Sequence, residues 1–186
     1  MLGIATTLVY PSLMHRASLC SALPEDSDED IDELVSLRPK TPEYEMIDMS
    51  QFKDWETDNA FHGTLKGESM IENYEVYHNK EKDEVMCIIT FGKSLNGHPG
   101  IVHGGITSLA FDNTFGWLFI ALKTDPAFTA NLNINYRRKV PANSHCVIRA
   151  RVTKREGRKL FMSGTMEDAQ GNILADGTSL FIVVRQ

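Results

Sequence analysis

A single acidic side chain interrupts an apolar stretch of the sequence, and it is the first candidate for chemistry. Asp112 lies inside the segment from His103 to Leu122, which contains no lysine or arginine. A carboxylate buried without a countercharge is costly, so such a residue usually has a chemical role or a dense set of hydrogen bonds. The alternative is an interior aspartate bonded to backbone or to polar neighbours. We favour a functional role for Asp112.

A pair of glycines directly before the same segment is the second candidate. His103 is followed by Gly104 and Gly105. Glycine permits unusual torsions and a close backbone approach, while the first turn of a helix leaves amide N–H groups unpaired at the positive end of its dipole. Such amides can stabilise the negative oxygen that forms when a carbonyl carbon is attacked, an effect of ~3 to 4 kcal/mol per donor in other enzymes. Alternatively, the glycines only let a helix pack closely against a sheet.

The spacing between these two features limits how they can cooperate. Gly105 and Asp112 are seven residues apart, which is ~10 Å along one helix axis. Reacting groups must approach to ~3 to 3.5 Å. If both features serve one reaction, two antiparallel helices from two subunits must therefore bring them together, as a two-fold interface permits. We expect a composite site.

A third candidate is the segment 129–137, in which polar and apolar residues alternate. Strict alternation places two sets on opposite faces of a strand: Thr129, Asn131, Asn133, Asn135 and Arg137 on one, and Leu132, Ile134 and Tyr136 on the other. The polar face could simply be the solvated face of a sheet. However, asparagine is a poor strand former, and the basic run 137–139 follows. This polar track with a positive end would suit phosphate groups.

The surrounding pattern predicts the elements that must position these residues. Apolar residues at helical spacing and the scarcity of charge predict a long buried helix over 101–122. Alternating or apolar runs bounded by turn residues predict strands over 71–77, 84–91, 127–137, 145–154, 159–167 and 173–184, the first two forming a hairpin. Consecutive strands with one long helix indicate an α+β domain in which an antiparallel sheet curls around that helix.

Composition excludes several classes of protein. With 186 residues, 42% of them hydrophobic, the chain can bury one core. A net charge of -6 and a pI near 5.5 oppose nucleic-acid binding. Three cysteines without metal-type spacing argue against a disulfide scaffold and a metal site. No run approaches the ~20 apolar residues of a transmembrane helix.

The first 70 residues differ in composition from the predicted domain. Residues 1–24 contain no Asp or Glu and one arginine, which fits either a mitochondrial presequence or a plain tail, so both the cytoplasm and the mitochondrion are compatible locations. The acidic run 25–33 predicts a solvated linker, followed by irregular chain to about residue 43 and a short helix over 43–59. We therefore divide the chain into an extension (1–45), a lead-in segment (46–70) and a domain (71–186).

Several motifs, taken in order, resemble one known family. They are the His103-Gly104-Gly105 turn with Asp112 nine positions after the histidine, the run Thr-Ala-Asn-Leu-Asn-Ile-Asn-Tyr at 129–136, Gly157-Arg158-Lys159, and 178–182. This set resembles the acyl-CoA thioesterases of the hotdog superfamily, particularly the branch of thioesterase superfamily members four and five. The similarity covers roughly residues 71–184, and several ordered motifs are more specific than any one of them.

The resemblance implies a hotdog fold, a homodimer or dimer of dimers, and hydrolysis of fatty acyl-CoA to a free fatty acid and coenzyme A. No separate cofactor is implied, because coenzyme A is part of the substrate. Asp112 would be the general base or nucleophile, Gly104 and Gly105 would sit at the oxyanion turn with His103, and Thr129 would position water or Asp112. Contacts to coenzyme A would map to Asn135, Arg137, Glu156, Gly157 and Arg158.

Departures from the family and competing functions qualify these expectations. The segment between Asp112 and Thr129 is one residue longer than in that branch, so a preference for acyl chain length does not carry over, and Asn96 only approximately matches an upstream family amide.

The chain lacks Gly-x-Ser-x-Gly, which opposes a serine triad, and it lacks the loop motif of hotdog hydratases. His98 and His103 have no further obvious metal ligands. The remaining rival is a non-catalytic acyl-CoA-binding or protein-interaction module, against which Asp112 weighs.

Overall fold

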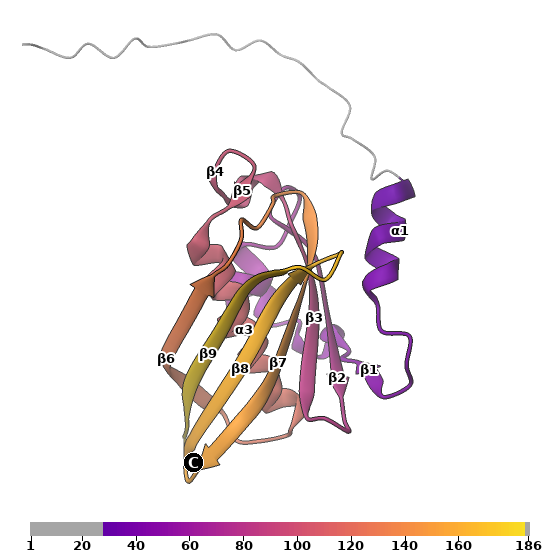
Figure 1. Ribbon diagram of the computed structural model, residues 1–186. Coiled ribbons are helices and arrows are strands. Elements are labelled where there is room, and N and C mark those ends of the chain that lie inside the picture. The colour runs from indigo at the N-terminus through magenta and orange to yellow at the C-terminus, as the bar shows by residue number, and fades with distance from the viewer. Residues whose placement is uncertain (1–27, 185–186) are drawn as a thin grey trace, which may run out of the picture.

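The computed structural model describes residues 28–184, and in it an antiparallel sheet curls around one long helix, α3 (Gly104–Ala121) (Figure 1). The seven strands are hydrogen-bonded in the order β1-β2-β3-β7-β8-β9-β6. Their bounds are β1 Tyr44–Met46, β2 Ile71–Asn79, β3 Glu84–Phe91, β6 Ala127–Tyr136, β7 Ser144–Glu156, β8 Lys159–Asp168 and β9 Ile173–Val183. The α+β architecture predicted from the sequence is confirmed. Residues 1–24, with the predicted presequence, lie outside the described residues.

The central helix is buried because its surface is apolar nearly all round. Phe111, Phe115 and Leu118 are each 0% exposed and belong to the main hydrophobic core between α3 and the inner face of the sheet. The helix is shorter than predicted. Residues Ile101–Val102 form strand β5, which pairs with β4 (Asn96–His98), and the helix begins at Gly104 because His103 caps it.

The predicted β2–β3 hairpin is confirmed, with Asn79 opposite Glu84. Asn79 accepts hydrogen bonds from the backbone N–H groups of Glu81 and Lys82, and Asp83 adopts a left-handed conformation with φ 49°. Asparagine and aspartate favour such turns because their short side chains bond to nearby backbone. The turn fixes the register of the two strands.

A bulge in β6 breaks the alternation predicted for residues 129–137. Thr129 pairs with Phe181 and Asn131 pairs with Leu180, so Ala130 is an extra residue. One inserted residue moves the side chains before it to the other face of the sheet. Thr129 therefore faces α3 rather than sharing the outer face with the three asparagines, and that part of the prediction was wrong.

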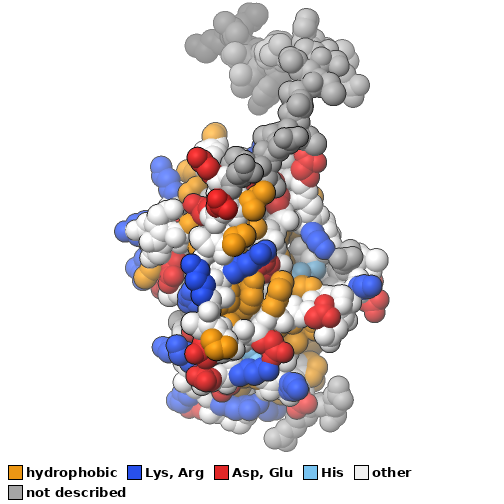
Figure 2. Space-filling model, turned by 90° about the vertical axis from the view of Figure 1, so that its right-hand side faces the viewer, with side chains coloured by type: hydrophobic (Ala, Val, Ile, Leu, Met, Phe, Trp, Pro, Cys, Tyr) orange, Lys and Arg blue, Asp and Glu red, His pale blue; other side chains and the backbone are white. Residues whose placement is uncertain are grey.

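The acidic segment is not a linker over the residues described. Residues 28–37 form helix α1 (Asp28–Leu37), which lies against the outer face of the sheet. Its Leu34 and Leu37, with Tyr44, pack against a second apolar cluster: Tyr77, Met86, Ile88 and Val147. The self-repulsion of the acidic residues is offset because the helix turns its leucines toward the sheet. Figure 2 shows this side of the molecule, where hydrophobic side chains form a band down the middle.

Ion pairing also holds the extension to the sheet. The Arg38 guanidinium donates to the buried Glu75 carboxylate at 2.5 Å, and the Tyr77 hydroxyl donates to it at 2.6 Å. Burial opposes ionisation of Glu75, but these two donors outweigh it and lower the pKa of the carboxyl. The irregular chain predicted up to residue 43 is confirmed for residues 38–43, whereas the residues before them form the docked helix.

The lead-in segment consists of short pieces instead of the single helix predicted over 43–59. After β1 come a 3-10 turn η1 (Met49–Phe52), a short helix α2 (Trp55–Asp58) and a π-helical turn η2 (Ala60–Thr64), and a further 3-10 turn η3 (Lys93–Leu95) precedes β4. β1 adds to the sheet edge, with Tyr44 opposite Asn79. No helix within residues 28–184 combines the length and apolar composition that a membrane span requires.

Candidate active site

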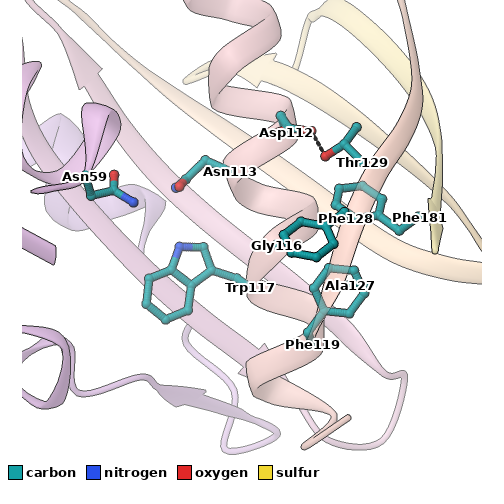
Figure 3. A pocket seen from close by; sticks show the side chains of 10 residues that line it. All are labelled: Asn59, Asp112, Asn113, Gly116, Trp117, Phe119, Ala127, Phe128, Thr129 and Phe181. Atoms are coloured by element: carbon teal, nitrogen blue, oxygen red, sulfur yellow. Dashed lines mark hydrogen bonds between the residues drawn. The ribbon is translucent and has the colours of Figure 1, made fainter. Parts of the chain in front are cut away.

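Asp112 and Thr129 meet between the helix and strand β6. The Thr129 hydroxyl donates a hydrogen bond of 2.7 Å to Oδ1 of Asp112, which is half-buried on α3 (Figure 3). The bulge at Ala130 makes this contact possible by turning Thr129 inward. Within residues 28–184 the side chain of Asp112 forms no other hydrogen bond. The second carboxylate oxygen is therefore available to a ligand.

The two side chains lie at one end of a pocket of about 240 Å³. In Figure 3 the pocket runs along α3 from Asp112 to Phe119. Its lining residues are Asn59, Asp112, Asn113, Gly116, Trp117, Phe119, Ala127, Phe128, Thr129 and Phe181. Asp112 is the one ionisable side chain among these lining residues. A carboxylate beside an aromatic wall can act on a polar group attached to an apolar chain.

Two amides that line the pocket were not predicted from the sequence. Asn59 accepts hydrogen bonds at its Oδ1 from the N–H groups of Phe61 and His62, and so it caps turn η2 at the pocket edge. Asn113 donates to the Tyr74 hydroxyl at 2.8 Å. Asn59 lies in a segment without periodic pattern, far from Asp112 in the chain, so no local signal pointed to it.

Neutral groups lie behind Asn113. The Tyr74 hydroxyl contacts Sγ of Cys87 at 3.3 Å, and burial raises the pKa of Tyr74 well above its usual value and that of Cys87 to about 11. Burial lowers the pKa of His62 to about 4. These three groups are therefore uncharged near neutral pH, and none of them supplies a countercharge close to Asp112.

The two glycines at the start of α3 are not equivalent. Nδ1 of His103 accepts the Gly105 N–H at 2.9 Å, whereas the Gly104 N–H makes no hydrogen bond within residues 28–184. The Tyr136 hydroxyl, a residue not predicted to take part, donates to the Gly104 carbonyl at 2.9 Å and also bonds to Ser108. The turn is thus fixed from β6, and Gly104 offers the free donor.

The glycine turn and Asp112 stay apart in one chain. Both belong to the continuous helix α3, so Gly104 lies ~12 Å from Asp112 along its axis. The contacts of the helix with β6 show the same separation, because Thr129 bonds Asp112 and Tyr136 bonds Gly104. A single copy does not bring together the two features that the sequence proposed.

The expected phosphate contacts on β6 are already paired. Asn135 donates to Oδ1 of Asp176 at 2.8 Å, and the Arg137 guanidinium forms an ion pair with Oδ2 of the same carboxylate. The hydrogen bonds from Arg137 and Asn135 lower the pKa of Asp176. Asp176, on β9, was not predicted. It partly neutralises Arg137, whose side chain is 56% exposed.

The turn Glu156-Gly157-Arg158 lies at the opposite end of the sheet from Arg137. It joins β7 to β8 next to Ile182, near the start of β6, whereas Tyr136 pairs with Ala175 at the far end of the same strand. The two sets are therefore separated by roughly 30 Å along the strands. Gly157 has φ 56°, which suits glycine at this tight turn.

Comparison with known proteins agrees with the resemblance seen in the motifs. Residues 99–175 match the thioesterase superfamily. Acyl-coenzyme A thioesterase THEM4 of Rattus norvegicus is 37% identical over 110 residues, covering 59% of this chain and 47% of that protein. Acyl-coenzyme A thioesterase THEM5 of Mus musculus is 29% identical over 114 residues, covering 61% and 44%. The chain thus spans about half the length of the curated relatives it matches.

Solved structures share the fold. A hypothetical thioesterase from Streptococcus pneumoniae TIGR4, solved with coenzyme A, superimposes with a TM-score of 0.56 at 22% identity, covering 62% of this chain and 91% of that one. The hotdog fold and the resemblance to the thioesterase superfamily, including the branch of members four and five, are confirmed.

Proposed function

We propose that this chain hydrolyses fatty acyl-CoA to a free fatty acid and coenzyme A. One observation carries the proposal: Asp112, held by Thr129, is the ionisable group of a pocket whose other wall is aromatic. An acyl thioester offers a polar carbonyl for the carboxylate and an apolar chain for Phe119, Phe128 and Phe181. The names of the relatives support this choice.

Asp112 acts as a general base or as a nucleophile. As a base, its carboxylate takes a proton from water while the water oxygen attacks the thioester carbonyl carbon. As a nucleophile, it forms a mixed anhydride that water then cleaves. In both routes the carbon–sulfur bond breaks and coenzyme A leaves as its thiol. Thr129 holds Oδ1, so the other oxygen remains for the reaction.

The oxyanion requires a donor, and the glycine turn of the same chain lies ~12 Å from Asp112 along α3. The free N–H of Gly104 suits this role, and it must come from a second copy. Strand β6 can bind a second copy of the chain. It is hydrogen-bonded to β9 on one side, and its other edge is unpaired within the described residues. Exposed edge strands readily pair with another chain.

A two-fold axis that passes between two paired β6 strands, near their midpoints, satisfies two geometric needs together. Antiparallel pairing of two β6 strands places the Thr129 end of one copy beside the Tyr136 end of the other, and with them Asp112 and the partner's glycine turn. It also brings the turn 156–158 of one copy toward the partner's Arg137, so that both sets contact one coenzyme A. Phe128, 70% exposed, and Tyr136, 54% exposed, lie on this strand. The active unit is thus a homodimer, or a dimer of dimers.

Thiol release from fatty acyl-CoA by the purified chain tests the proposal. We expect turnover by the wild type and a fall of at least roughly 100-fold in Asp112→Asn, because an amide cannot serve as base or nucleophile. Asp125→Asn, the same change at an exposed site, is the matched control and should retain activity. Binding of acyl-CoA without thiol release by the wild type would favour the non-catalytic module instead.

A further inference from the structure

Phe119 lies between the pocket beside Asp112 and a second cavity at the C-terminal end of α3. The second cavity has a volume of about 330 Å³, and Phe119 lines both. The other residues around the second cavity are Asp83, Leu118, Leu122, Thr124, Val152, Thr153, Lys154, Arg155 and Leu160. The reaction described above uses none of these other side chains.

The ring of Phe119 is held in place by the sheet. It is 9% exposed, and its centroid lies 5.0 Å from that of Phe181 on β9. Phe119 follows Asp112 by seven residues, which is ~10 Å along the helix. Figure 3 shows it at the end of the pocket opposite Asp112 and Thr129. A chain that starts at Asp112 and runs along the helix therefore meets this ring.

The floor of the second cavity is apolar. Leu118 and Leu160 belong to the buried core, and Val152 packs against it. The basic residues stand on the exposed rim, where Lys154 is already paired with Glu156 at 2.5 Å. Methylene groups gain free energy when they are buried against such a floor.

We propose that Phe119 sets the acyl chain length by closing the first pocket against the second cavity. This inference rests on the proposed thioesterase function. A pocket of about 240 Å³ is smaller than the roughly 300 to 1,000 Å³ of typical ligand sites, and adding the second cavity brings it within that range. In the wild type the acyl chain ends at the Phe119 ring, and removing the ring opens the second cavity to longer chains.

The test is the chain-length profile of kcat/KM for straight-chain saturated acyl-CoA esters. Phe119→Ala should move the optimum to longer chains, with a gain of roughly fourfold for each further methylene that becomes buried. Phe119→Leu, a smaller change, should move it in the same direction and covers the case in which the alanine variant does not fold. Adding Val152→Phe, which refills the second cavity, should return the optimum toward that of the wild type.

Phe115→Ala is the matched control, because Phe115 lies one helical turn earlier, is fully buried and lines neither cavity. It should lower stability and leave the optimum unchanged. An unchanged optimum in folded Phe119 variants of an active enzyme would overturn the role of Phe119 alone. A wild type that hydrolyses none of the esters would instead overturn the proposed function.

Discussion

Hydrogen bonding at the start of α3 separates two residues that look alike in the sequence. Gly105 already donates to His103, so Gly104 is the better oxyanion donor. The backbone at this turn is compatible with proline at position 104, which would remove the N–H. His103 is extended, with φ -60° and ψ 133°, as a residue before proline must be, and proline is favoured at the first position of a helix.

Gly104→Pro should therefore remove the free N–H with little change to the fold. We expect kcat to fall by roughly 100- to 1,000-fold, the loss seen when one oxyanion donor is removed. Gly104→Ala keeps the N–H, and its added Cβ would lie 3.4 Å from the Tyr136 ring, an ordinary contact. Steady-state kinetics of the two variants should differ widely, and equal activity would remove Gly104 from the mechanism.

Arg137 is predicted to act on binding rather than on chemistry. Its guanidinium would meet phosphate groups of coenzyme A far from the thioester. Arg137→Ala should raise KM several-fold, with a smaller change in kcat, when both are measured with one acyl-CoA ester. A large fall in kcat at unchanged KM would place Arg137 at the reacting atoms instead.

At the scale of the elements, the sequence predicted most of the strands and the central helix of the domain, because their alternating and helical hydrophobic patterns extend over many residues. The bounds of β3 were predicted to the residue, whereas the bulge at Ala130 left no periodic signal. Thr129 was named as a partner of Asp112, yet on the wrong face. Asp176 and Asn59 were missed, since each enters the site through pairing between segments distant in the chain.

Helix α1 shows why composition misled us about the extension. An acidic run repels itself, but a spacing of three residues places Leu34 and Leu37 on one side of the helix, and the outer face of β2, β3 and β7 offers an apolar cluster for them to cover. Charge was given more weight than this amphipathic pattern. The extension is therefore expected to contribute to stability.

Leu37→Ala should lower the free energy of unfolding by about 1 to 2 kcal/mol, because Leu37 is partly buried against the sheet. Ile31→Ala on the same helix is the control, since Ile31 is 48% exposed and should matter little. Urea unfolding of the two variants checks the prediction. Equal stability would mean that α1 does not dock in solution.

At the scale of the whole molecule, one copy holds two half-sites. Asp112 with Thr129 lies toward one end of β6, and the glycine turn with Tyr136 lies toward the other. The expected coenzyme A contacts are divided in the same way. Two-fold pairing of β6 joins each half to its complement, so catalysis should depend on the dimer rather than on the fold of a single chain.

Mixed dimers of Asp112→Asn and Gly104→Pro subunits test this claim most directly. Each parent dimer carries a lesion in both sites and should be inactive. In the mixed dimer, one site carries both lesions and the other carries neither. Thiol release by purified mixed dimers, formed from differently tagged subunits, should recover to about half of the wild-type rate. Mixed dimers of folded subunits that stay as inactive as either parent would contradict an active site built from two chains.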